Sequence, residues 1–121
     1  MIIGTGIDIV ELRRIEQIVK KQPRFIERIL TEMERADYAA LHERRKIEWL
    51  AGRFAAKEAF VKAVGTGISA QFRWHDVEIR NEASGKPYIA VLKPFYGRIH
   101  LSISHSMDYA IASVIIESSS S

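Results

Sequence analysis

The stretch "LAGRFAAKEAFVKAVGTG", residues 50–67, decides the fold because its pattern predicts one long apolar helix. Apolar and small residues recur here at steps of three and four, which is the period of one helix face. They are Leu50, Ala51, Phe54, Val61 and Gly65, and Ile47 continues the pattern just before the stretch. Glu58 completes this stripe. A buried carboxylate is costly unless a cation meets it, so the stretch raises the question of what neutralises Glu58.

The first half of the chain predicts a strand followed by helices. Residues 2–10 are rich in β-branched residues and apolar on both faces, which favours a central strand. Helices are expected over 11–21 and 24–30, separated by Pro23. A third begins at Thr31, where Glu34 completes a capping box, and runs to about His42. The long helix then covers about 43–64 and ends at the glycines of "GTG".

The second half of the chain predicts strands. Residues 74–92 indicate a hairpin that turns at "ASGKP", and 98–106 and 110–117 predict two more strands joined by a tight turn. The expected fold class is α+β: an N-terminal strand, helices that include one long helix, then an antiparallel β meander. We expect a single domain over residues 1–117 and a frayed serine tail over 118–121.

Composition and the N-terminal residues indicate the cellular compartment of the protein. The chain has 121 residues, of which 47% are hydrophobic, and it contains no cysteine. Disulfide and thiolate chemistry are thus excluded, and an intracellular compartment fits. The first residues place an apolar run before the charges, the reverse of a secretory signal, and no run approaches the roughly 20 apolar residues of a membrane helix. We expect a soluble, cytoplasmic protein.

The positive charge is concentrated in one segment. The whole chain carries a net charge of +3, whereas residues 12–28 hold six basic residues against two acidic ones, a local net charge of +4. A basic surface of this kind favours an acidic partner, either a protein or a phosphate. The plainer interpretation is a solvated helix face.

Two carboxylates in apolar settings suggest a metal site. Strand period places Asp8 on the same face as Gly4 and Gly6, where the glycines let other groups approach. Asp8 and Glu58, without cysteine or clustered histidine, suit Mg²⁺ better than zinc. Lys62 follows Glu58 by one helical turn, and lysine is a usual supplement for phosphate. The set predicts phosphoryl chemistry, in which positioning and charge neutralisation dominate.

Each of these features also has a plainer interpretation. Asp8 can cap the following helix or pair with a basic residue, and Glu58 with Lys62 can form a simple helix ion pair. His105, in the block "SISHS" at 102–106, can be a satisfied core histidine. Four unusual features in one small chain nevertheless favour a shared site: Asp8, the pair of Glu58 and Lys62, the "GTG" at 65–67 and the "SISHS" block.

The sequence closely resembles the bacterial holo-acyl-carrier-protein synthase family, the short type of 4'-phosphopantetheinyl transferase. The blocks that carry the resemblance are "GIDIVE" at 6–11, "GRFAAKEAFVKAVGTG" at 52–67, "GKPYI" at 85–89 and "SISHS" at 102–106. They stand in family order and span nearly the whole chain. The combination of the first two blocks is highly specific, whereas "SISH" or "GKP" alone is weak.

The resemblance implies transfer of 4'-phosphopantetheine from coenzyme A to a serine of apo acyl carrier protein, in support of fatty acid biosynthesis. The other product is adenosine 3',5'-bisphosphate. It also implies a homotrimer with active sites at the subunit interfaces. Such an interface would enclose a ligand that one small chain cannot.

The same resemblance assigns roles to residues. Asp8 and Glu58 match the Mg²⁺ ligands, and Lys62 would neutralise charge on the phosphates. The other residues expected at the coenzyme A site are Arg53, Phe54, Gly65, Thr66, Pro87, His105 and Ser106. The residues expected to bind the carrier protein are Arg14, Ile18, Lys21, Arg24 and Phe25, although Phe25 also fits an ordinary core position. Glu58 or a metal-bound water is the expected base, and His105 is less favoured.

Two other functions compete with this one. A nucleic-acid-binding module would use the basic first half, but exposed aromatic residues for single strands are sparse and Asp8 and Glu58 would stay unexplained. A Mg²⁺-dependent phosphotransferase acting on a nucleotide alone would turn over without a protein acceptor.

Overall fold

The computed structural model describes residues 1–119 of the chain. The first half holds β1 (Ile2–Glu11), α1 (Leu12–Lys21), α2 (Arg24–Ile29), α3 (Glu32–Ala39) and α4 (Glu43–Val64). The second half holds a 3-10 turn, η1 (Trp74–Asp76), and the strands β2 (Val77–Asn81), β3 (Pro87–Val91), β4 (Arg98–His105) and β5 (Tyr109–Glu117). The α+β prediction, with one long helix followed by antiparallel strands, is confirmed.

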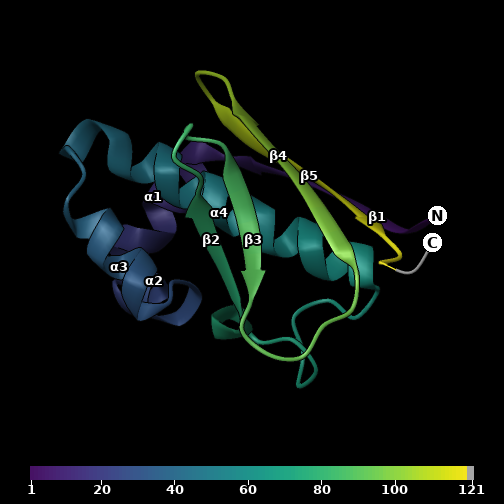
Figure 1. The fold of residues 1–121 in the computed structure, drawn as a ribbon. Helices are drawn as coiled ribbons and strands as arrows, with labels where there is room; N and C mark the ends of the chain where they lie inside the picture. Colours follow the sequence, from purple (N-terminus) through teal and green to yellow (C-terminus); the bar gives the residue numbers. More distant parts are fainter. Residues whose placement is uncertain (120–121) are drawn as a thin grey trace.

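The strands form two sheets that share α4 as their support. β1, β5 and β4 pair in that order, all antiparallel, and β2 pairs with β3 as a separate hairpin. α4 runs behind both sheets, with α1, α2 and α3 gathered at one end of the molecule and both termini at the other (Figure 1). α4 is therefore buried on most sides, and its alanines at 51, 55, 56 and 59 have no exposed surface.

The prediction that β1 is a central strand is wrong. Among the described strands β1 lies at the edge of its sheet. One face of β1 packs on α4, but the opposite face leaves Ile3, Ile7 and Ile9 exposed at 57%, 59% and 62%. β1 does carry apolar residues on both faces, but within one chain only the face toward α4 is covered.

The start of α3 agrees with the prediction, whereas its end and the role of His42 differ. The capping box at Thr31 is present, because its side chain accepts from the backbone N–H of Glu34 and Glu34 reaches back to the N–H of Thr31. α3, however, ends at Ala39 rather than near His42. His42 instead caps α4, with its Nδ1 accepting from the backbone N–H of Arg44 at 3.3 Å.

Near the chain ends, Ser118 donates its backbone N–H to the carbonyl of Met1 at 2.8 Å. The serine tail expected to fray covers residues 118–121, and its last two residues, 120–121, lie outside the described residues. Within residues 1–119, no helix combines the length and hydropathy that a bilayer crossing needs.

Candidate active site

β1 and α4 meet without side chains between them, and this contact sets the position of Asp8. A Cβ atom on Gly6 would lie 2.0 Å from the carbonyl oxygen of Ala59, and one on Gly4 would lie 2.2 Å from that of Ala63. Only glycine allows so close an approach of two backbones. Asp8 follows on the same face of the strand, so its carboxylate reaches α4 at the level of Lys62.

Lys62 ties Asp8 to this contact. Its ammonium donates to Oδ1 of Asp8 at 2.9 Å and to the carbonyl oxygen of Ile7 at 3.1 Å. The Asp8 side chain is 14% exposed, whereas that of Lys62 is 50% exposed. The lysine can therefore turn toward a ligand while the carboxylate stays fixed.

Glu58 lies beside this pair. Burial is the main cause that raises the pKa of the Glu58 carboxyl above its usual value of 4.5, and the negative charge of Asp8 raises it further. The nearby Lys62 acts in the opposite direction. Two carboxylates that repel each other in a half-buried place are a natural site for a cation.

A cleft of about 380 Å³ opens next to the two carboxylates. Asp8 and Glu58 form its acidic end, and Arg14 also lines it. Its apolar walls are Ile9, Val10, Ile15, Ile18, Phe25 and Phe54. Phe54 lies between two other aromatic rings, 5.8 Å from Phe25 and 5.4 Å from Trp74 between ring centroids. The structure thus brings Asp8, Glu58, Phe54 and three of the expected carrier-binding residues to one cleft.

Phe25 is only 7% exposed, so it forms a wall of the cleft rather than a projecting anchor. Its alternative interpretation, as a packed residue, fits the structure better. Lys21 and Arg24 are exposed on the same helical layer but do not line the cleft.

The donor set fits Mg²⁺ and does not fit zinc. In residues 1–119 no three side chains of histidine, cysteine, aspartate or glutamate gather closely enough to hold a metal on their own. Mg²⁺ is usually held by one or two protein carboxylates, with waters and substrate phosphates completing its shell. The Asp8 and Glu58 pair matches that requirement.

The fully buried charge on α4 is Lys57, not Glu58. The Lys57 side chain has no exposed surface, and its ammonium lies 2.6 Å from Oε1 of Glu34, which is also fully buried. The expected stripe placed Glu58 at the centre of a single buried face. That prediction is wrong because a helix packed on most sides has no single buried face. The only sign of such packing in the sequence is the abundance of small residues in the stretch.

The remaining expected coenzyme residues lie on other surfaces. Gly65 ends α4 in the left-handed conformation, with φ 95°, and Thr66 Oγ1 donates to the carbonyl of Gly67 at 2.8 Å. Arg53 is nearly buried: it stacks on Trp49 at 4.2 Å and donates from a terminal nitrogen to Asn81 Oδ1 at 2.8 Å.

Asn81 connects Arg53 to the turn that contains the "GKP" block. Its Nδ2 donates to the carbonyl of Gly85 at 2.8 Å, and it pairs with Pro87 across the β2–β3 hairpin. Arg53 therefore holds the turn near Pro87 through Asn81.

His105 and Ser106 lie at the β4–β5 turn. Nε2 of His105 is 2.8 Å from Oε1 of Glu48 on α4, and about half of its side chain is exposed, so it is not a core histidine. Ser106 closes the turn: its backbone N–H donates to the carbonyl of Tyr109, and its Oγ accepts from the N–H of Tyr109.

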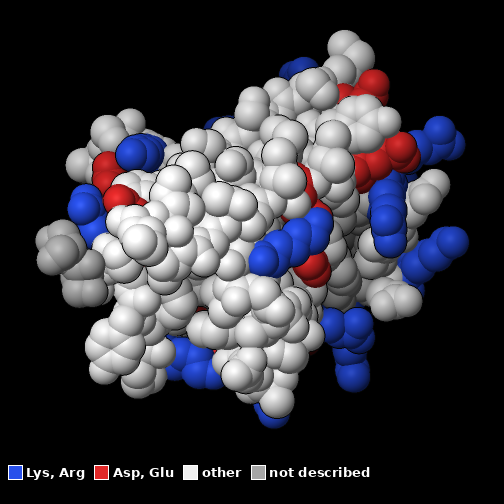
Figure 2. All heavy atoms as spheres, turned by 90° about the vertical axis from the view of Figure 1, so that its right-hand side faces the viewer, with Lys and Arg blue, Asp and Glu red and all other residues white. Residues whose placement is uncertain are grey.

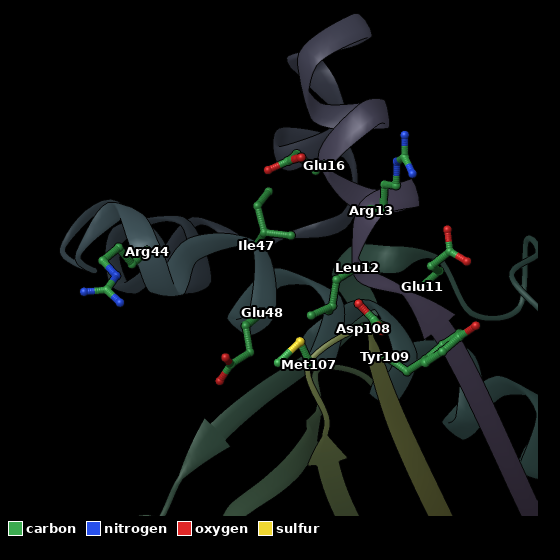
Figure 3. A pocket seen from close by; sticks show the side chains of 10 residues that line it. All are labelled: Glu11, Leu12, Arg13, Glu16, Arg44, Ile47, Glu48, Met107, Asp108 and Tyr109. Carbon is green, nitrogen blue, oxygen red and sulfur yellow. The ribbon is translucent and has the colours of Figure 1, made fainter.

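A larger pocket of about 580 Å³ adjoins this turn and was not expected from the sequence. Figure 3 shows the side chains of α1, α4 and the β4–β5 turn around it. The lining residues are Glu11, Leu12, Arg13, Glu16, Arg44, Ile47, Glu48, Met107, Asp108 and Tyr109. No spacing in the sequence links these three segments. Arg53, Pro87, His105 and Ser106 line neither this pocket nor the cleft at Asp8 and Glu58.

Comparison with known proteins gives consistent matches. A family model described as the 4'-phosphopantetheinyl transferase superfamily matches residues 4–114. A protein of Halalkalibacterium halodurans named holo-[acyl-carrier-protein] synthase is 60% identical over 121 residues, covering all of both chains. A Bacillus subtilis protein of the same name is 54% identical, again over the whole of both chains.

Solved structures agree with these sequence matches. A holo-(acyl-carrier-protein) synthase from Bacillus anthracis, in complex with CoA (3',5'-ADP), superposes with a TM-score of 0.91 at 51% identity, covering 98% of this chain and 99% of that one. The Helicobacter pylori synthase in complex with coenzyme A gives a TM-score of 0.83 at 34% identity, covering 93% and 99%.

Proposed function

The chain belongs to the 4'-phosphopantetheinyl transferase superfamily, as a transferase of the holo-[acyl-carrier-protein] synthase type, and we propose that it modifies an apo acyl carrier protein. It transfers 4'-phosphopantetheine from coenzyme A to a serine hydroxyl, with Mg²⁺, and releases adenosine 3',5'-bisphosphate. The reaction supports fatty acid biosynthesis. The observation that carries the proposal is full-length identity of 60% to a protein of that name, together with an acidic pair at the mouth of a cleft.

The transfer breaks a phosphoanhydride bond of coenzyme A and forms a phosphoester bond to the serine. The serine oxygen bonds to the phosphorus that carries the pantetheine arm, and the bond from that phosphorus to the bridging oxygen of the pyrophosphate breaks. The serine proton must leave as this happens. Glu58 is our candidate to accept it, because its carboxylate lines the cleft together with Arg14 and Ile18, where a bound partner would present its serine.

Asp8 and Glu58 would hold Mg²⁺, which when bound supplies positive charge to the pyrophosphate. Lys62, already in contact with Asp8 and half-exposed, would add a second positive charge for the leaving phosphates. Fixed charges of this kind lower the barrier to phosphoryl transfer because they need no rearrangement during the reaction.

The carrier protein would approach the helical layer around α1. Arg14 and Ile18 line the cleft that contains Glu58, so a partner that contacts them can present its serine to that carboxylate. The exposed Lys21 and Arg24 extend the basic surface toward a partner of negative charge. Electrostatic attraction of this kind speeds encounter and weakens as salt is added.

A second subunit would complete the site in a homotrimer. The exposed isoleucines of β1 form an apolar row that a single chain leaves in water. Figure 2, which views the side that carries both termini, shows a wide area with few charged side chains. Arg53, Pro87, His105 and Ser106, which stand apart from the acidic cleft, would then contact the coenzyme from the neighbouring subunit.

The test is to measure the nucleotide product with and without a protein acceptor. Purified protein, Mg²⁺ and coenzyme A are incubated with an apo acyl carrier protein, and adenosine 3',5'-bisphosphate is measured by chromatography. The proposal predicts product only when the carrier is present and its serine intact. Product formed without a carrier would support a nucleotide phosphotransferase instead. RNA that competes with coenzyme A, without any turnover, would support the nucleic-acid-binding alternative.

A further inference from the structure

The reaction as proposed makes no use of Lys57, a fully buried cation on the same helical turn as Phe54 and Glu58. Its ammonium donates to the carbonyl of Ile29 at 2.6 Å, to Oε1 of Glu34 at 2.6 Å and to the carbonyl of Trp74 at 3.2 Å. An ammonium has three donors, so all three are satisfied by acceptors on three different elements. These are the last residue of α2, the first turn of α3 and η1.

The acceptors are themselves fixed. Glu34 accepts from the backbone N–H of Thr31 at 2.8 Å and from that of Ile79 at 2.7 Å. Thr31 in turn donates to Glu78 Oε2 at 2.6 Å. Lys57 is therefore the point at which α4 is bonded, through buried polar contacts, to α2, α3 and β2.

One element held by Lys57, α2, contributes Phe25 to the wall of the acidic cleft, and another, η1, packs against that wall through Trp74. Phe25 lies one helical turn before Ile29 on α2, and both are buried. The ring of Trp74 stacks on Phe54, and Phe54 contacts Phe25. The bonds to the carbonyls of Ile29 and Trp74 therefore set how far the Phe25 wall stands from the helix that carries Glu58.

We propose that Lys57 is a positioning residue that sets the acceptor-side wall of the cleft relative to Glu58. This inference rests on the proposed function, because it assigns the Phe25 wall to the carrier protein. Asp8 lies on β1, Lys62 on the last turn of α4 and Gly65 directly after it, and no hydrogen bond of the Lys57 cluster reaches them. Phe54, also expected at the coenzyme A site, meets the cluster only through the stacking of its ring on Trp74. Loss of Lys57 should therefore weaken use of the carrier far more than use of coenzyme A.

The test compares a double variant that lacks both buried charges with a control variant that only loosens packing in the core. Lys57→Met/Glu34→Gln removes both buried charges, so no ion is left without its counter-ion. Glutamine keeps one oxygen for the capping contact at Thr31 and loses the oxygen that accepts from the N–H of Ile79. Val114→Ala, in β5 and away from the cleft, is the control that only loosens packing. For folded proteins we measure the KM for carrier, the KM for coenzyme A and amide hydrogen exchange in α2 and β5.

The double variant should raise the KM for carrier about tenfold, change the KM for coenzyme A by less than about twofold, and speed exchange in α2 but not in β5. The control should leave both KM values as they are. Unchanged carrier KM and unchanged α2 exchange, or an equal rise in both KM values, would overturn the proposal.

A second variant and the exchange measurement test the proposal if the double variant or the carrier assay fails. If the double variant does not fold, Lys57→Arg keeps the charge but not the three-acceptor geometry, and it should show the same selective effect at smaller size. An equal effect of Lys57→Arg on both substrates would also overturn the proposal. If wild-type protein modifies no carrier, the proposed function fails, and the α2 exchange alone still decides whether Lys57 holds α2.

Discussion

At Glu58, activity and stability make opposite demands. Its pKa is raised mainly by burial and then by Asp8, so the folded protein keeps the proton at a pH where the unfolded chain has lost it. The contribution of this group to stability is therefore complete below the unfolded pKa and is lost as pH rises through the folded one. At neutral pH the charged Glu58 destabilises the metal-free protein.

Glu58→Gln should therefore raise the melting temperature of the metal-free protein at pH 7 by a few degrees. The same change should lower turnover by about 100-fold or more, because the proton acceptor and one metal ligand are lost. Thermal denaturation in a chelator and a turnover assay measure the two effects. Glu82→Gln, at an exposed residue of the β2–β3 turn, is the matched control and should change neither. A lower melting temperature for Glu58→Gln would contradict the repulsion between the two carboxylates.

Among the elements, the contact between β1 and α4 carries the site. The strand lies directly on the helix backbone at Gly4 and Gly6, and the next residue on that face is Asp8. A larger residue at either glycine would push the strand away and with it the carboxylate.

Gly6→Ala should destabilise the protein by about 3 kcal/mol or more, because the added Cβ would stand 2.0 Å from the carbonyl of Ala59 and neither backbone can yield. Gly52→Ala is the control within α4. Its Cβ meets only the side chain of Ile103, at 3.2 Å, and alanine favours the helix, so its effect should be small. Denaturant unfolding of both variants measures the difference. Equal stability of the two would mean that β1 does not depend on this approach.

α1 is the element proposed to bind the carrier protein. Arg14→Ala should raise the KM for carrier about three- to tenfold and flatten its dependence on salt, because this residue lines the cleft. Lys20→Ala removes the same charge from an exposed position that does not line the cleft, and should have little effect. Steady-state kinetics at two salt concentrations separate them. If both variants behave alike, the basic residues act only through their total charge.

Helices and hairpins with strong periodicity and caps could be predicted from the sequence, whereas the way these elements pack together could not. The long helix over 43–64, the capping box at Thr31 and the hairpins follow from local patterns, and all are present. The edge position of β1 was missed because apolar residues on both faces indicate burial without saying what covers them. The meeting of Asp8 with Lys62 was not itself predicted, since it depends on how closely the glycines let β1 approach α4. The pocket beside the β4–β5 turn joins three distant segments, so local patterns carry no trace of it.

At the scale of the whole molecule, the exposed face of β1 argues for self-association. Ile7→Lys places a charge in the middle of the apolar row and should convert an assembly with the mass of three chains into single chains with little turnover. Met33→Lys, on the exposed surface of α3, is the control and should stay assembled. Light scattering coupled to size-exclusion chromatography gives the masses. A wild-type protein with the mass of one chain that is fully active would contradict the shared site.

The proposed transfer is tested most directly by the intact mass of an apo acyl carrier protein after incubation with this protein and coenzyme A. The measurement is made with Mg²⁺ and with a chelator, alongside a carrier whose acceptor serine is alanine. The proposed transfer should add one phosphopantetheinyl group to the intact carrier, only with Mg²⁺ and only when the serine is present. An unmodified carrier under all conditions, or full modification by the Glu58→Gln variant, would contradict it.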